Sequence, residues 1–404
     1  MAEPALGARF GLLWTSGTVS ALGDGVTAVA APLLVARLTG NPLQVSGVAV
    51  AATLPWLLFS LLSGGLVDRL DRRRVMVVVD TVRAVAVGAL GVAVLLHRGG
   101  VVLLYAVAFL LGAGDTLFRA ASLAVLPALV PRDLLERANA RLGAAQTVVR
   151  SMIAGPLAGV LFAAAVASPF LLDAGSFAVG AALLALLPGS FRPTGRPEGG
   201  SLRHEILAGL HWLLGHRLLR TLAVLIGLLN VTLTAAMSIL VLLATRRLGL
   251  GSVGYGLLFT AAAVGALLGA LVGERLIRRF TASVTLRVGL LIETAFHLTL
   301  ALTTSPAVAG IALAVFGVHG SLWTIVSTSL RQRLTPEPML GRVNSAYLFL
   351  AAGGNAFGAL LGGLVATRFG LTAPYWIGFV VAAAVTAATW RVFDRATMTA
   401  AAAA

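Results

Sequence analysis

Ionisable residues inside strongly apolar segments are costly unless they have a partner or a water-filled cavity, and six of those in this chain matter most. They are Asp24, Asp115, Arg119, Arg150, Asp173 and Glu293. Asp24 lies between two glycines and has no basic residue three or four positions away that could pair with it on one helix. We therefore expect Asp24 to gain and lose a proton as its surroundings change between wet and dry. The alternative is a structural carboxylate that accepts backbone hydrogen bonds at a glycine-loosened bend.

Asp115 and Arg119 are four residues apart in one apolar segment, so a helix would place them on one face and within reach of each other. The spacing predicts an ion pair. With Asp24, these two residues are our candidates for proton coupling and substrate contact. A permanent pair with a purely structural role is the alternative. Glu293 precedes His297 by one helical turn, so this second pair could also share a proton.

Several kinds of chemistry are excluded. The chain has no cysteine, which excludes disulfides and thiolate metal sites. Its six histidines are scattered, without a metal-ligand spacing backed by carboxylates. It has no lysine to complete a phosphate-binding loop, which excludes ATP hydrolysis by such a loop. We expect no enzymatic activity, no metal and no cofactor.

The composition requires that these residues be positioned in a membrane. Of 404 residues, 58% are hydrophobic and only 11% are charged, with a mean hydropathy of +0.96. A soluble domain needs roughly a quarter of its residues charged, so this chain must face lipid. At about 20 to 25 residues per span, the length accommodates about twelve transmembrane helices and no soluble domain.

Apolar runs bounded by Arg, Pro or Gly place six spans on either side of a polar interval. They cover residues 10–36, 43–67, 75–96, 101–126, 141–165, 168–187, 221–244, 253–277, 284–303, 307–330, 344–366 and 374–392. With the amino terminus inside, 20 arginines lie on the cytoplasmic side and five lie outside. The positive-inside rule therefore places both termini in the cytoplasm. The net charge of +15 is explained by this rule and requires no nucleic-acid partner.

The expected organisation is an all-α integral membrane protein with two bundles. Residues 1–188 form the N-terminal six-helix bundle, 189–216 a cytoplasmic linker, 217–395 the C-terminal bundle and 396–404 a tail. Apolar residues recur at helical spacing from Leu202 to Leu214 in the linker. This pattern predicts either a helix lying on the inner leaflet or an early extension of the seventh span.

Two matches support similar bundles. The segment 68–73 (DRLDRR) recurs at 274–279 (ERLIRR), an offset of 206 residues, each time after the second span of its half. The pattern Pro131, Leu135, Arg137, Asn139 recurs as Pro336, Leu340, Arg342, Asn344, an offset of 205. Parallel repeats of this kind are typical of transporters whose halves rock about a central site.

These residues resemble the major facilitator superfamily across essentially the whole chain. The match to its signature loop after the second span comprises Gly64, Leu66, Asp68, Arg69, Arg72 and Arg73, with Asp71 where the family usually has glycine. Within this superfamily, the chain resembles the branch that exports macrolides, other drugs and siderophores. The residues that carry this resemblance are Gly23, Asp24, Asp80, Arg83, Arg137, Asn139, Asp173, Ser176 and Phe177.

The resemblance implies roles for particular residues. Asp68 would contact a helix end in the opposite half and release it during opening, and Glu274 with Arg275 would mirror that contact. Arg119 lies near the superfamily's fourth-span arginine, which is associated with proton coupling. Gly155, Pro156 and Gly159 resemble the motif of proton-coupled antiporters, although Val160 replaces its last glycine. Asn230, His319 and Trp323 fall on spans that line the central cavity in the family, whereas Glu293 falls on a peripheral span.

The sequence therefore predicts a secondary active exporter of amphipathic or hydrophobic small molecules, driven by proton antiport through alternating access. We expect a monomer in the bacterial inner membrane. Uptake of a polar nutrient by symport or facilitated diffusion is one alternative, and uncoupled lipid transport or sensing is another.

Overall fold

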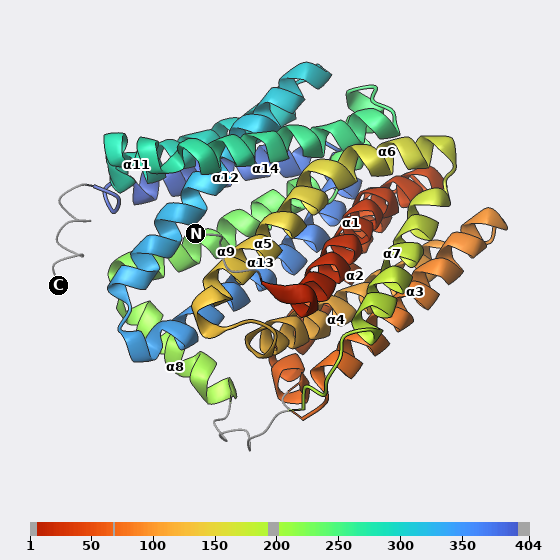
Figure 1. The fold of residues 1–404 in the computed structure, drawn as a ribbon. Coiled ribbons are helices and arrows are strands. Elements are labelled where there is room, and N and C mark those ends of the chain that lie inside the picture. Colours follow the sequence, from red (N-terminus) through yellow and green to blue (C-terminus); the bar gives the residue numbers. More distant parts are fainter. Residues whose placement is uncertain (1–5, 68, 193–201, 395–404) are drawn as a thin grey trace. The chain divides into compact units, whose positions relative to one another are not determined.

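The structure is a computed structural model, and it describes residues 6–67, 69–192 and 202–394. Helices are the only regular secondary structure in these ranges (Figure 1). In the first half they are α1 (Gly7–Leu38), α2 (Pro42–Val67), α3 (Arg72–Leu95), α4 (Val101–Val125), α5 (Leu135–Thr147), α6 (Ala154–Ala164) and α7 (Ser168–Ala185). In the second half they are α8 (Leu202–Gly215), α9 (Arg217–Met237), α10 (Leu240–Leu242), α11 (Ser252–Leu302), α12 (Pro306–Leu334), α13 (Leu340–Phe369) and α14 (Ala373–Thr389).

Two segments have π-helical hydrogen bonding, η3 (Val148–Ile153) and η4 (Leu243–Arg247). Short 3₁₀ turns flank the longer helices at η1 (Leu126–Ala128), η2 (Arg132–Leu134) and η5 (Glu337–Met339). The predicted fifth span is therefore composite: α5, η3 and α6 follow one another without a loop.

Ten helical stretches in the described part of the chain are long and apolar enough to cross a membrane. One of them, α11, contains a break at Thr281, where φ is +67°. This break lies between the predicted spans 253–277 and 284–303, and it is a kink at one residue, so the helix extends beyond both predicted ends. Counting both segments of α11 and adding the shorter α14 reproduces the predicted number of twelve spans.

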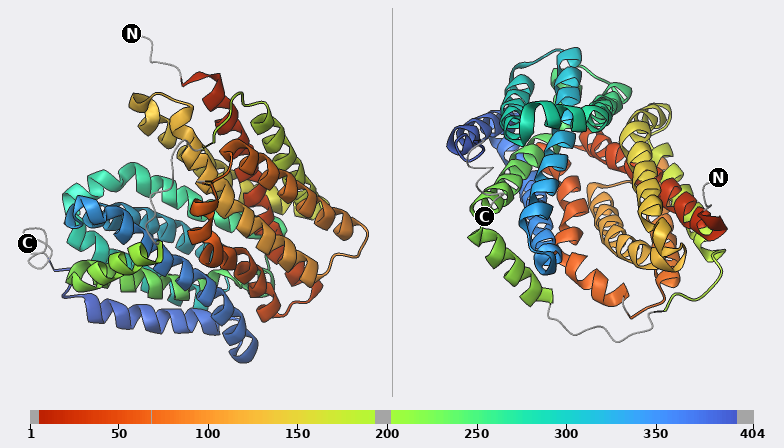
Figure 2. Two further views of the ribbon diagram at one scale, coloured as in Figure 1. Left: turned by 90° about the horizontal axis from the view of Figure 1, so that it is seen from below. Right: turned by 60° about the vertical axis from the view of Figure 1, so that its left-hand side comes forward.

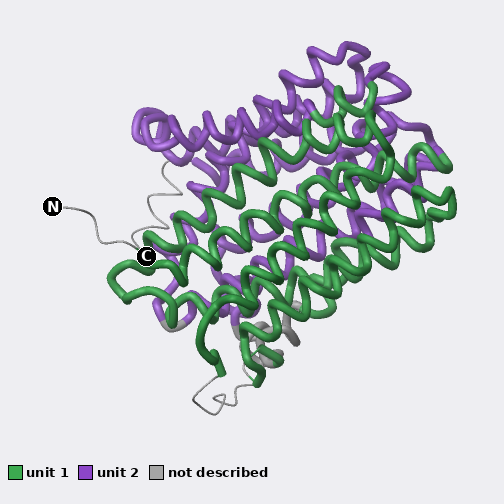
Figure 3. Tube along the Cα trace, turned by 45° about the vertical axis from the view of Figure 1, so that its right-hand side comes forward, with its two compact units in different colours: residues 1–39, 51–198, 251–256 green, residues 40–50, 199–250, 257–404 purple. Residues whose placement is uncertain are grey.

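The chain divides into two compact units, shown in Figure 3. Unit 1 comprises residues 1–39, 51–198 and 251–256, and unit 2 comprises 40–50, 199–250 and 257–404. Within unit 1, α1 packs on α6 and α7, and α3 packs on α4 and α7 (Figure 2). Within unit 2, α13 packs on α8 and α9, and α14 packs on α9.

Small residues allow these helices to approach closely, as is common in membranes. In unit 2, Gly354, Gly358 and Gly362 of α13 face the backbone of α9, where any Cβ would overlap backbone atoms. Because the three glycines are four residues apart, they form one continuous face.

The helix in the linker is separate from the seventh span. His216 interrupts the helical backbone and is the N-cap of α9. Its side chain accepts a hydrogen bond from the backbone N–H of Leu219 in the first turn of α9. The interpretation of this segment as an early extension of the seventh span is therefore wrong. Within unit 2, α8 packs on α13, with Gly209 against the backbone of Arg342 and Leu213 buried beside Val343.

Candidate functional site

Charged side chains from five elements of unit 1 are grouped together and are called here the charged network; ion pairs join six of them, and the seventh, Asp173, is joined to α1 by a hydrogen bond from Thr27. Its members are Asp24 of α1, Asp80 and Arg83 of α3, Asp115 and Arg119 of α4, Arg150 of η3 and Asp173 of α7. Sequence reasoning selected Asp24, Asp115 and Arg119, and the structure brings these three together.

Asp115 lies at the centre of the charged network. Arg119 donates from Nε to Asp115 Oδ2 at 3.0 Å, so the ion pair predicted from the four-residue spacing is formed. The guanidinium groups of Arg83 and Arg150 lie 3.8 and 4.0 Å from Asp115 Oδ1. One carboxylate thus faces three cations.

Asp24 pairs with a cation from another helix. Arg150 Nη2 donates to Asp24 Oδ2 at 3.0 Å, across 126 positions of sequence. Arg150 lies in η3, and π-helical turns redirect side chains relative to an α-helix and often occur at functional sites. Gly25 allows α1 to approach the backbone of Arg150, where a Cβ would be crowded. Sequence reasoning missed this pair because it searched only the helix that carries Asp24.

Arg83 and Asp80 form the buried side of the network. Both side chains are almost inaccessible, at 2% and 0%, and their charged groups are 3.7 Å apart. Arg83 also donates to the carbonyl of Leu111 at 3.1 Å and lies against the rings of Phe118 and Phe177. These contacts fix the position of the guanidinium.

Asp173 is held by hydroxyl groups. Thr27 of α1 donates to Asp173 Oδ2 at 2.6 Å, and Ser176 Oγ lies 3.3 Å from Oδ1. The side chain is completely buried, and among the described residues no cation lies within ion-pair distance. Gly23 makes this possible, because a Cβ there would overlap the Asp173 carboxylate.

The charges of the network do not balance. Three carboxylates face three guanidinium groups, and Asp173 adds a fourth carboxylate without a paired cation among the described residues, so the fully ionised network would carry one excess negative charge. A proton on any of the carboxylates removes that excess. The side chains of Arg119 and Arg150 are 45% and 38% accessible and those of Asp24 and Asp115 are 17% accessible, so this side of the network is not enclosed by the protein.

Two arginines of the signature loop after α2 donate hydrogen bonds to backbone carbonyls of unit 1. Arg72 donates to the carbonyl of Ala124 at 2.9 Å, and Arg73 donates to the carbonyl of Leu187 at 2.7 Å. Arg69 is exposed, Gly64 lies within α2, and Asp68 lies outside the described residues. The predicted gating contact of Asp68 therefore stays a prediction.

Asp71, which replaces the usual glycine, has a structural role. Its side chain caps α3 by accepting from the backbone N–H of Arg74 at 3.1 Å, and it also accepts from Ser190 Oγ at 3.0 Å. Partial burial acts to raise the pKa of this carboxyl, but hydrogen bonds from Arg74, Ser190, Phe191 and Arg73 outweigh it and hold the pKa below its ordinary value.

The corresponding segment of unit 2, residues 274–279, lies within α11 and is more exposed. Glu274 pairs with Arg278 at 3.2 Å, and both side chains are exposed, at 81% and 70%. Arg275 is also exposed. The predicted contact of Glu274 and Arg275 with the other half stays a prediction.

The residues that resemble the antiporter motif pack against the first turn of α11, which belongs to unit 1. A Cβ on Gly159 would crowd the backbone of Ser252 and Val253, and Ser252 Oγ donates to the Gly159 carbonyl at 3.0 Å. Gly155 and Pro156 similarly face Gly256. The observed role of these three motif residues is close helix packing.

Unit 2 contains a smaller titratable cluster. His297 and His319 lie on either side of Glu293, with Nε2 atoms 3.5 and 3.4 Å from its two carboxylate oxygens. All three side chains are at most 7% accessible. We call these residues the Glu293 cluster.

The predicted cavity residues contact other helices of unit 2. His319 faces Glu293, Trp323 is buried in an apolar core that includes Leu286 and Leu290, and Asn230 Nδ2 donates to the Ala351 carbonyl of α13 at 3.4 Å. Their role in lining a cavity stays a prediction.

Comparison with known proteins identifies the family. A model of the family described as transmembrane secretion effector matches residues 3–403. The chain belongs to this family of the major facilitator superfamily. The chain is 31% identical over 362 residues to the enterobactin exporter EntS of Citrobacter koseri, covering 86% of this chain and 82% of that protein. It is also 31% identical over 365 residues to EntS of Salmonella choleraesuis, covering 86% and 83%.

Solved structures of major facilitator proteins share the fold. The nucleoside transporter NupG superposes with a TM-score of 0.72 at 12% identity, covering 96% of this chain and 100% of NupG. A bacterial homologue of the iron transporter ferroportin has a TM-score of 0.74 at 17% identity, covering 96% and 99%. The predicted family and the all-α transporter fold are confirmed, and the protein is a multi-pass membrane transporter.

Proposed function

We propose that this transporter is a secondary active exporter of amphipathic or hydrophobic small molecules, drug-like or siderophore-like, driven by proton entry. Relatives about 31% identical carry the name enterobactin exporter, which supports the direction of transport and the substrate class. The charged network is the observation that carries the proton part, because its carboxylates outnumber its guanidinium groups.

The proposed mechanism uses the contact between Asp24 and Arg150. An ionised Asp24 binds the guanidinium at 3.0 Å and so holds α1 against η3. A proton on Asp24 removes the charge that attracts Arg150, which weakens this contact and favours another packing of the two elements. Protonation thereby biases an equilibrium between two conformations, which is what alternating access requires.

We further propose that the protein works as a monomer in the bacterial inner membrane, with both termini in the cytoplasm. In this proposal it needs no cofactor or nucleic-acid partner and has no catalytic activity of its own. The distribution of the arginines supports the orientation. A reporter fused after residue 395 should be active only inside the cell, and activity outside would contradict the orientation.

Transport into inverted membrane vesicles tests the function. The cytoplasmic face then points outward, so an antiporter should accumulate an uncharged fluorescent dye inside vesicles whose interior is acidic. A protonophore should abolish the accumulation, and vesicles without the protein are the control. Equal uptake with and without the pH gradient would instead indicate an uncoupled lipid-like transporter, and accumulation only under the opposite gradient would indicate nutrient uptake.

A further inference from the structure

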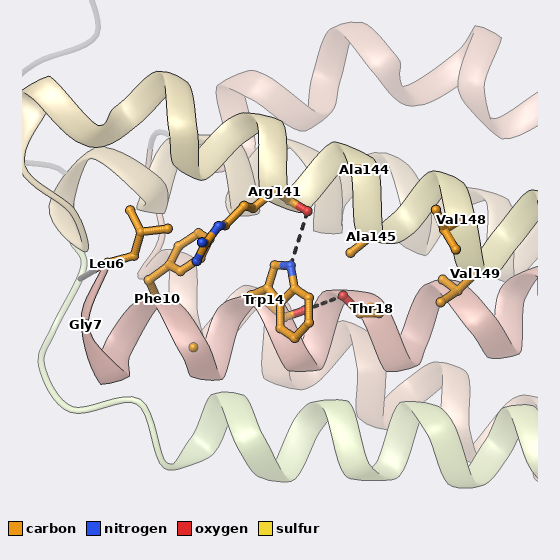
Figure 4. A pocket seen from close by; sticks show the side chains of 11 residues that line it. Leu6, Gly7, Phe10, Trp14, Thr18, Arg141, Ala144, Ala145, Val148 and Val149 are labelled. Carbon is orange, nitrogen blue, oxygen red and sulfur yellow. Dashed lines mark hydrogen bonds between the residues drawn. The ribbon is translucent and has the colours of Figure 1, made fainter. Parts of the chain in front are cut away.

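A pocket of about 710 Å³ lies in unit 1 between α1 and the composite span formed by α5 and η3. It is lined by Leu6, Gly7, Phe10, Gly11, Trp14, Thr18, Arg141, Ala144, Ala145, Val148 and Val149, as Figure 4 shows. A volume of this size accommodates a drug-sized molecule. It lies outside the charged network, although Val149 immediately precedes Arg150.

The aromatic part of the lining is fixed in orientation. Trp14 Nε1 donates to the backbone carbonyl of Arg141 at 3.2 Å, which ties α1 to α5. Thr18 Oγ1 donates to the Trp14 carbonyl at 2.7 Å, so this hydroxyl is also satisfied. With those polar groups occupied, the half-buried Trp14 ring offers the pocket apolar surface suited to a flat apolar group, while Phe10 lines the pocket with only 4% of its surface accessible.

Among the described residues of this lining, Arg141 is the one that carries a charge, and none of them is a carboxylate. Its side chain is exposed and extends from α5 toward Phe10 (Figure 4). Among the described residues, its guanidinium has no ion-pair or hydrogen-bond partner. A guanidinium beside aromatic rings matches a molecule that combines an aromatic group with an acid group.

We propose that this pocket binds the exported molecule and that it selects aromatic anions, with the acid group at Arg141 and the aromatic group against Phe10 and Trp14. The inference rests on the proposed function for the statement that the ligand is exported. The selectivity itself follows from the lining. Since the ligand contacts Arg141 and not the charged network, binding and proton coupling use different residues.

Equilibrium dialysis on the purified full chain in phosphatidylcholine nanodiscs tests the inference without any transport step. The probes are 2-naphthoate and 2-naphthylmethylammonium, which have the same aromatic group and opposite charges. The wild-type protein should bind the anion more tightly than the cation. Arg141→Gln should weaken anion binding roughly tenfold or more, as expected for the loss of one charge-assisted hydrogen bond.

Two further variants and a lipid arm complete the test. Ala144→Phe should fill the pocket from an exposed position and weaken binding of both probes, while Arg132→Gln, which removes an exposed arginine outside the lining, should leave both unchanged. Equal anion affinity in wild type, Arg141→Gln and Ala144→Phe would overturn the inference. Loss of naphthoate binding when phosphatidylglycerol is added would also overturn it, by showing that the pocket takes anionic lipid.

These outcomes are distinct from a failure of the proposed function. If the protein binds naphthoate through Arg141 but accumulates no dye under a pH gradient, the binding pocket is supported and the proposed export is contradicted. If the protein exports dye but binds both probes equally, the proposed export is supported and the selective pocket is contradicted.

Discussion

The two units hold buried charge in different ways. In unit 1, carboxylates and guanidinium groups from five elements meet, and the side chains of Arg119 and Arg150 are accessible. In unit 2, the charged or titratable partners of Glu293 among the described residues are His297 and His319, and all three side chains are at most 7% accessible. The first group therefore has an open side, whereas the second is enclosed by protein.

The chemistry of the cations adds to this difference. Guanidinium groups stay protonated, so any change of charge in the network must occur on a carboxylate. The Glu293 cluster contains no guanidinium, and its one carboxylate lies between two imidazoles from α11 and α12. We therefore propose that proton coupling belongs to unit 1 and that the Glu293 cluster serves helix packing.

The largest effect on stability is expected from Arg83→Met. This change leaves Asp80 and Asp115 without their buried cation, and breaking a buried ion pair by removing one partner costs about 3 to 5 kcal/mol. Thermal or denaturant unfolding of the detergent-solubilised protein measures the loss. Adding Asp80→Asn should restore part of the stability, because it removes one uncompensated carboxylate. Unchanged stability of Arg83→Met would mean that the network does not depend on this cation.

A smaller effect is expected from Glu293→Gln. Glutamine keeps the shape and can still hydrogen-bond to His297 and His319, so the free energy of unfolding should fall by about 1 to 3 kcal/mol. Dye accumulation and its dependence on pH should remain those of the wild type. Loss of the pH dependence in a well-folded variant would transfer proton coupling to unit 2 and reverse the comparison.

The smallest effect is expected outside the membrane, from Asp71→Ala. The variant loses the cap of α3, which should cost about 1 kcal/mol at pH 7. Because the folded-state pKa of Asp71 is lowered, its stabilising contribution is full above the unfolded value of about 3.9 and is lost as pH falls through the folded value. The difference in unfolding midpoint between wild type and variant should therefore shrink below about pH 4. A difference that stays constant across this range would show that the charge of Asp71 does not contribute.

Local sequence patterns predicted those features that depend on neighbouring residues. Apolar run length predicted the spans, and a four-residue spacing predicted the Asp115 and Arg119 pair. The boundary expected between residues 277 and 284 lies at Thr281, but no Gly or Pro lies between Gly273 and Gly289, so no signal in the sequence indicated the exact residue of the kink.

The rest of the network depends on packing between helices that are distant in sequence. Arg150 reaches Asp24 only because a π-helical segment presents it to α1 and Gly25 lets the two elements approach. Arg83 reaches Asp115 from a neighbouring helix, and no spacing within one helix could indicate that contact. The best signal available in the sequence was the presence of arginines inside apolar spans.

The most direct test of proton coupling in unit 1 compares two transport modes of Asp24→Asn in inverted vesicles. Asparagine fixes the neutral form, so we expect substrate exchange without a gradient at near wild-type rate but no accumulation driven by an acidic interior. Asp133→Asn, which neutralises an exposed carboxylate before α5, is the matched control and should behave like the wild type in both modes. If Asp24→Asn still accumulates substrate with normal pH dependence, Asp24 is a structural residue and protons take another route.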